Sequence, residues 1–203
     1  MEVKNIGLYG KLKKNRRMNM IEDEKYELNI CVKNAPISPR ERQEVERILN
    51  EQGIGIVFLE YRGIMNSVFD AIPIYLNPEI VNLLVTNMMT SAMYDALKTS
   101  LFYMVSKITS RLNRNDKKSS GAAFRMKIGN IEINADIPTF LGNEQFSRYM
   151  DMLQETSAHI AEIQKESEDR ATTLFMVYDE ENECLDTKTI AEYVDIEKNK
   201  RDN

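Results

Sequence analysis

The N-terminal half of the chain combines two hydrophobic patterns. From Tyr26 to Lys33, apolar side chains occupy every second position, which predicts a strand with one buried face. The segment SPRERQEVERILNEQG opens with Ser38, Pro39 and Glu41, residue types that favour a helix start with a capping box. The next segment, IGIVFLEY, is apolar at almost every position, which is typical of a strand covered on both faces. These segments together predict a unit of strand, helix and parallel strand.

The longest apolar stretch predicts a single central helix over residues 78–113. Asn77 and Pro78 suit the N-cap and the first helical position. Within the stretch, the fifteen residues from Ile80 to Tyr94 carry no charge. The apolar side chains are spread around the helical circumference, so we expect protein to cover most of it. This helix would pack between the sheet and a second helix, or it would contact another protein chain.

The sequence FRMKIGNIEINADI predicts a β-hairpin. Gly129-Asn130 separates two alternating runs, and a glycine in the first turn position is typical of two-residue hairpin loops. Pairing outward from the turn places Ile128 opposite Ile131, and Lys127 opposite Glu132. The apolar pair would face the core and the charged pair the solvent, so the register and the hydrophobic pattern agree.

The remaining elements complete a mixed α+β fold. Apolar residues spaced by three and four positions predict a helix over residues 143–167. TTLFMVYD predicts a strand over residues 172–179, and a turn and a weak terminal helix follow it. We expect one sheet of about four or five strands, covered by helices. A single domain over residues 26–195 would lie between a basic and polar arm (1–25) and a charged tail (196–203).

Charge and cysteine content limit the classes of partner and compartment. The net charge is −5, but the first 20 residues carry +5, which leaves −10 for the remaining 183. An acidic body repels phosphate backbones, so nucleic acid is not an expected partner. Cys31 and Cys184 are the only cysteines, and the N-terminal residues lack the pattern of a secretory signal. Both features favour a cytoplasmic protein.

Candidate catalytic residues are few. His159 is the only histidine, and no glycine-rich phosphate loop or Cys/His metal spacing occurs, so we expect no bound cofactor. One enzymatic alternative depends on carboxylates. Glu60 ends an apolar strand, Asp70 has apolar neighbours, and Asp95 interrupts the long helix. If these acids converge on a divalent cation, the protein would resemble a metal-dependent nuclease in its chemistry.

The preferred hypothesis is a non-catalytic protein–protein interaction or regulatory module. The helix over residues 78–113 would form a homo-oligomer contact, because its apolar side chains exceed what one stripe requires. Methionine suits such a surface, because its flexible thioether repacks easily against different partners. The candidate interaction residues are Met88, Met89, Met93, Leu97, Leu101 and Met104.

A second alternative is a membrane-acting protein that uses the segment 64–108. A transmembrane helix requires about 20 predominantly apolar residues. The uncharged run here is shorter, it contains polar residues such as Asn82 and Thr90, and Asp95 follows it directly. Membrane insertion is therefore disfavoured, and we expect protein to cover this segment.

Overall fold

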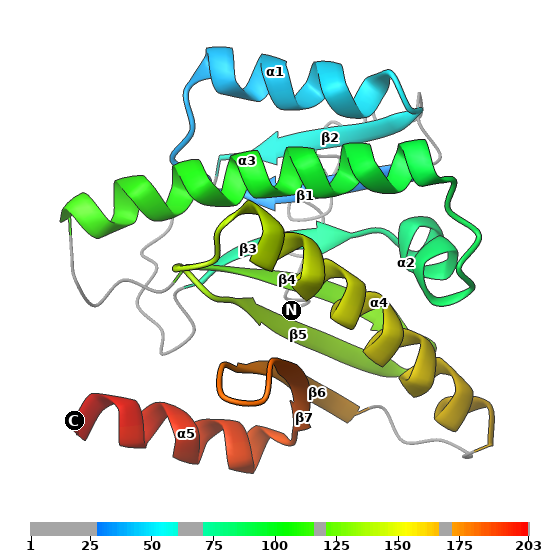
Figure 1. Ribbon diagram of the computed structural model, residues 1–203, viewed down its shortest axis with the longest axis vertical. Coiled ribbons are helices and arrows are strands. Elements are labelled where there is room, and N and C mark those ends of the chain that lie inside the picture. The colour runs from blue at the N-terminus through cyan, green and yellow to red at the C-terminus, as the bar shows by residue number, and fades with distance from the viewer. Residues whose placement is uncertain (1–27, 61–70, 116–120, 167–171, 203) are drawn as a thin grey trace, which may run out of the picture.

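The computed structural model describes residues 28–60, 71–115, 121–166 and 172–202 (Figure 1). The predicted N-terminal arm (1–25) lies outside these ranges. In chain order the described elements are β1 (Leu28–Lys33), α1 (Pro39–Asn50), β2 (Ile54–Leu59), β3 (Ile72–Leu76), α2 (Pro78–Val85), α3 (Ser91–Asn115), β4 (Ala122–Ile128), β5 (Ile131–Ile137), α4 (Asn143–Glu166), β6 (Thr172–Asp179), β7 (Cys184–Lys188) and α5 (Ile190–Asp202).

The described strands form one mixed sheet of seven strands, in the order β2-β1-β3-β4-β5-β6-β7. Parallel and antiparallel pairs alternate across it, starting with the parallel pair of β2 and β1. The predicted α+β class is confirmed, but the sheet is larger than the expected four or five strands. Two strands are additional: β3, directly before the predicted helix start at Asn77, and β7, within the predicted turn and terminal helix. The sequence of β7, CLDTK, has one buried apolar residue, Leu185, which is too few for a recognisable strand pattern.

The N-terminal unit of strand, helix and parallel strand forms as predicted. The Ser38 backbone N–H donates to the Glu41 carboxylate at 2.7 Å, and the Glu41 N–H donates to the Ser38 hydroxyl at 3.4 Å. This reciprocal capping box starts α1, as the sequence indicates. Gly53, with a φ of +74°, leads out of the helix into β2 in a conformation that glycine adopts without strain.

The IGIVFLEY strand, predicted to be covered on both faces, has no exposed residue from Ile54 to Leu59, but it is only partly buried along most of its length. β2 is an edge strand that pairs only with β1 in the described sheet, and its last four residues, Ile56 to Leu59, are half-buried. The Arg42 guanidinium lies over the Phe58 ring, 5.3 Å from its centroid, and so covers part of this edge. A continuous apolar run therefore does not distinguish a central strand from an edge strand that a helix partly covers.

The single helix predicted over residues 78–113 was wrong, because it is two helices, α2 and α3. Asn77 caps α2 as expected, since its side chain accepts the Ile80 N–H at 3.1 Å. The break comes at Asn87, which has a φ of +54°. The Asn87 N–H bonds the Leu84 carbonyl at 3.2 Å, and the next N–H bonds the Leu83 carbonyl at 3.0 Å. This pattern is a Schellman stop, in which a left-handed residue closes the last helical turn.

The hairpin of β4 and β5 forms with the predicted register. Ile128 pairs with Ile131 and Lys127 with Glu132, and Gly129 has a φ of +53° in the turn. Lys127 and Glu132 are exposed, whereas Ile128 is buried. Local turn chemistry and alternation were sufficient here, because both strands are adjacent in sequence.

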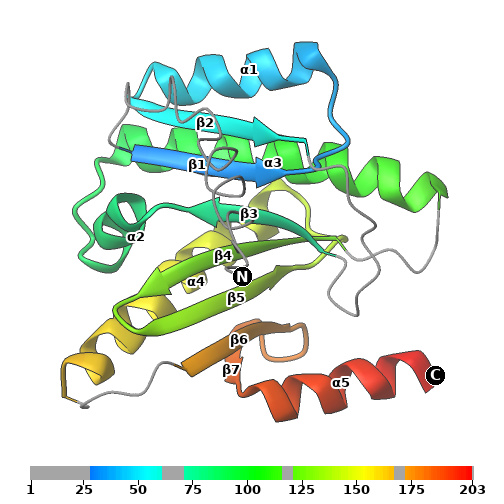
Figure 2. The same ribbon diagram turned by 180° about the vertical axis from the view of Figure 1, so that it is seen from behind.

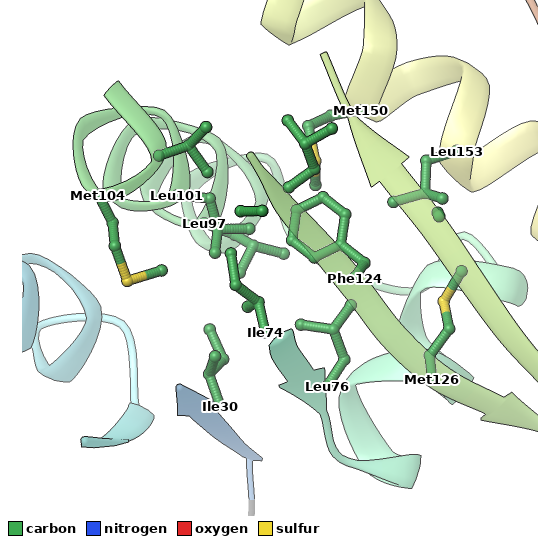
Figure 3. Close-up of a cluster of buried hydrophobic side chains, with 14 of the residues drawn as sticks. Ile30, Ile74, Leu76, Leu97, Leu101, Met104, Phe124, Met126, Met150 and Leu153 are labelled. Atoms are coloured by element: carbon green, nitrogen blue, oxygen red, sulfur yellow. The ribbon is translucent and has the colours of Figure 1, made fainter. Parts of the chain in front are cut away.

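Helices α1, α2, α3 and α4 lie on one face of the sheet (Figure 1). α3 and α4 lie side by side in one layer. α3 is therefore not enclosed between the sheet and a second helix, as one of the two expected arrangements had it. Leu101 of α3 and Met150 of α4 gather with other buried side chains around Phe124 of β4 (Figure 3). On the other face, Tyr193 of α5 stacks on Phe175 of β6, with ring centroids 4.1 Å apart. Of the described helices, α5 is the only one on that face, over β6 and β7 (Figure 2).

Candidate interaction site at the α2–α3 corner

The segment that joins α2 to α3 is an exposed surface without charged residues. We define the α2–α3 corner as residues 86–94, TNMMTSAMY. Met88 is 71% exposed, and Met89 and Met93 beside it are half-buried. The remaining positions up to Ala92 are exposed and are threonine, asparagine, serine or alanine. Protein interfaces are commonly depleted of charged residues and enriched in methionine, and the exposed part of the corner shares both features.

Hydrogen bonds from α4 hold the corner in one conformation. The Gln154 side-chain amide donates to the Leu84 carbonyl and to the Asn87 side-chain oxygen, both at 3.1 Å. Thr90 starts α3, because its hydroxyl accepts the Met93 N–H at 3.3 Å. The corner therefore has a helix stop on one side and a helix cap on the other. A surface fixed in this way loses little conformational entropy when a partner binds.

A polar network forms one border of the corner. The Lys98 ammonium lies 2.6 Å from the Asp151 carboxylate of α4, and the Tyr94 hydroxyl donates to the same carboxylate at 3.0 Å. The Lys98 ammonium also lies 4.4 Å from the centre of the Tyr94 ring. Burial, followed by the Asp151 charge, raises the pKa of the Tyr94 hydroxyl, so it stays protonated and donates. This border is charged but internally paired.

The six candidate interaction residues divide into two groups in the structure. Leu97, Leu101 and Met104 have no exposed surface and belong to the core between α3 and the sheet (Figure 3). Met88, Met89 and Met93 lie at the α2–α3 corner. Within one chain, protein therefore covers Val81 and Val105 on either side of the stretch, whereas residues 86–88 in its middle are exposed.

The acids of the nuclease alternative are not brought together in the described part of the chain. The Glu60 carboxylate is exposed and lies 3.2 Å from the Arg42 guanidinium of α1. Asp95 is exposed near the start of α3, and β2 ends at the opposite side of the molecule from that start (Figure 1). Asp70 lies outside the described residues. Among the residues that are described, no group of three or more His, Cys, Asp or Glu side chains could hold a metal ion.

His159 is exposed on α4. It lies beside Glu155 and Asp186 in an apolar groove between α4 and the β6–β7 pair. None of the helices in the described ranges contains a stretch that is both long and apolar enough to cross a bilayer.

A local signal for the corner is present in the sequence. Asn is the residue, after glycine, that most readily ends a helix in the left-handed conformation, and Thr is a good N-cap. Asn87 followed three residues later by Thr90 is therefore a stop and a start. The apolar residues between them masked that signal.

Neither a protein-family model, nor a curated protein, nor a solved structure matches the chain.

Proposed function

We propose that this protein is a non-catalytic interaction module that self-associates through the α2–α3 corner. One observation carries the proposal: an exposed, uncharged run of residues 86–92 in a chain in which 29% of the residues are charged. Met88 at its centre presents a flexible thioether to solvent, and the helices behind it are fixed by α4. The proposed contact is smaller than the one expected from the sequence: it consists of the α2–α3 corner and not of the whole stretch over residues 78–113.

Charge favours a second copy of the same chain as the partner. The chain has a net charge of −5, so two copies repel each other over most of their surfaces. At residues 86–92 they meet without like charges facing each other. An interface around a two-fold axis places the same residues on both sides, so a patch without charges is compatible with its own copy.

The first test compares the chain with a Met88→Glu variant by sedimentation velocity over about 1–100 µM. We expect the unchanged chain to form a dimer or larger assembly within this range. Met88→Glu places two negative charges against each other across the contact and should raise the dissociation constant at least ~10-fold, an effect typical of a central interface residue. Because Met88 is 71% exposed, this substitution should leave the fold intact, which circular dichroism would verify.

Ile190→Glu is the matched control. Ile190 is an apolar residue that is 52% exposed. It lies on α5, which follows the edge strand β7, away from the corner. This substitution adds the same charge and should leave the assembly unchanged. A chain that stays monomeric at the highest concentration, or equal weakening by both substitutions, would contradict the proposal. Leu101→Glu is not informative here, because Leu101 is a core residue and its replacement tests folding.

We also propose a cytoplasmic location. Cys31 on β1 and Cys184 on β7 are separated by five strand spacings of the sheet. At about 4.8 Å each, these spacings put the two residues roughly 24 Å apart, too far for a disulfide within one chain. A fold that depends on no disulfide suits a reducing compartment.

A further inference from the structure

Three strands carry polar side chains into one groove on the sheet face away from α3 and α4. Tyr75 of β3 pairs with Arg125 of β4, and Arg125 pairs with Asn134 of β5. Side chains of adjacent residues in a strand point to opposite faces. Since Phe124 points to the helices, this row points to the other face, which Figure 2 displays. The groove has a volume of about 570 Å³, and its lining includes Tyr75, Arg125, Lys127, Glu132 and Asn134.

Asn134 is a polar side chain in an unusual position. It is only 9% exposed, and it belongs to the lining of the groove. A side-chain amide carries both hydrogen-bond donors and an acceptor. A ligand in the groove can therefore exchange hydrogen bonds with a side chain that is already largely removed from solvent.

Two positive side chains line the same groove, beside Glu132, the single acidic residue of its described lining. Arg125 is half-buried and Lys127 is exposed, and neither makes an ion pair with a described residue. The Lys33 ammonium lies 4.6 Å from the centre of the Tyr75 ring and adds a third positive charge. On the helical face, by contrast, Lys98 is paired with a carboxylate at 2.6 Å. A half-buried guanidinium without an acceptor is suited to binding an anion.

We propose that this groove binds a nucleoside phosphate. The Tyr75 ring, 37% exposed, offers a flat surface on which a base stacks. Arg125 and Lys127 bind the phosphate, and the Asn134 amide and the Glu132 carboxylate contact the edge of the base. Glu132 accepts hydrogen bonds, so the site favours a base that carries an amino group. The volume of the groove lies within the usual range of small-molecule sites.

The acidic net charge does not oppose this ligand. The repulsion expected from the sequence concerns a long phosphate backbone that follows the whole surface. A single nucleotide stays within about 10 Å of the three positive side chains, which is about one Debye length at 0.1 M salt. The local charge of the groove therefore dominates the interaction.

Isothermal titration calorimetry of the full chain with adenosine monophosphate tests the proposal. Adenosine, inorganic phosphate and uridine monophosphate are the comparison ligands. We expect adenosine monophosphate to bind with a dissociation constant below about 1 mM and each comparison ligand to bind at least ~10-fold more weakly. No heat of binding at about 5 mM nucleotide would overturn the proposal. Equal affinity for inorganic phosphate would overturn it too, because the base would then contribute nothing.

Two variants locate the binding in the groove. Arg125→Gln should weaken adenosine monophosphate binding at least ~10-fold, since it removes the charge beside the phosphate. Asn134→Ala should also weaken binding, because it removes the amide that contacts the base, and circular dichroism would verify that the variant is folded. Arg148→Gln is the control on α4, where Arg148 is exposed beside Glu183, and its affinity should equal that of the unchanged chain. Binding that survives both groove variants would overturn the assignment.

Discussion

Glu41 joins two helices that are far apart in the sequence. Its carboxylate accepts the Ser38 N–H and hydroxyl at 2.7 and 2.8 Å, and the Arg111 guanidinium of α3 lies 2.6 Å away. The Ser38 N–H is the main cause that lowers the pKa of Glu41 from 4.5 to about 2, and the Ser38 hydroxyl and Arg111 add to it, while burial opposes them. The residue predicted to cap α1 therefore also fixes α1 against α3, a contact that the sequence pattern does not reveal.

Glu41→Gln should lower the free energy of unfolding at pH 7 by about 1 kcal/mol, because it removes a charge-assisted contact but keeps a capping oxygen. The pKa of Glu41 is lower in the folded chain than in the unfolded chain. Its carboxylate therefore contributes stability that is complete above about pH 5 and is lost as the pH falls from about 4.5 to about 2. Urea unfolding of both proteins at several pH values measures the difference, which should shrink over that interval.

Glu44→Gln provides the control on the same helix. Glu44 pairs with Arg47 at 2.8 Å on an exposed surface, so its replacement should change stability less than Glu41→Gln does. A pH-independent difference between the unchanged chain and Glu41→Gln would show that the carboxylate charge is not what connects α1 and α3.

At the scale of elements, a helix or strand was predicted correctly where the residues that stabilise it are close together in the sequence. The capping box of α1, the N-cap of α2 and the Gly129 hairpin are formed by residues close in sequence, and these elements were predicted with their bounds or register. The α2–α3 break was missed, because apolar continuity across residues 86–92 concealed one left-handed residue. β7 was missed, because its stability comes from pairing with β6 and not from its own composition.

Substitutions at Asn87 distinguish two separate helices from one continuous helix. The difference in stability between the alanine and the glycine variant has opposite signs in the two cases. Asn87→Ala and Asn87→Gly both remove the side-chain oxygen that accepts from Gln154, so their difference reports the backbone. At a φ of +54°, the alanine variant should be less stable than the glycine variant by about 1 kcal/mol. In one continuous helix, alanine would be the more stable by about the same amount. Thermal or urea unfolding of the two variants measures the difference and its sign.

At the scale of the molecule, strand order determines which side chains share a surface. The row of Tyr75, Arg125 and Asn134 comes from strands β3, β4 and β5, and the pairing of β3 with β4 crosses the α2 and α3 segments. The hairpin register alone places Arg125 opposite Asn134, so half of the groove was accessible from the sequence. Tyr75 was not, because no local pattern specifies which strand lies beside β4.

The arrangement of the whole molecule also explains why two of the predicted acids lie apart and why three of the predicted interaction residues are buried. Glu60 and Asp95 follow or interrupt apolar segments, yet the end of β2 and the start of α3 lie at opposite sides of the molecule (Figure 1). Leu97, Leu101 and Met104 share the apolar character of Met88, but the turn at Asn87 directs only the corner residues away from the sheet. Sequence composition indicates which residues avoid water, and the fold decides which of them remain available to a partner.

The most direct test of the proposed contact is amide hydrogen exchange, measured by mass spectrometry on the full chain below and above its association concentration. Our account predicts that exchange slows on association in peptides that contain residues 86–94 and stays unchanged in peptides from β2 and β7 at the two edges of the sheet. Slower exchange confined to β2, β7 or the groove beside His159, or no change at any concentration, would contradict it.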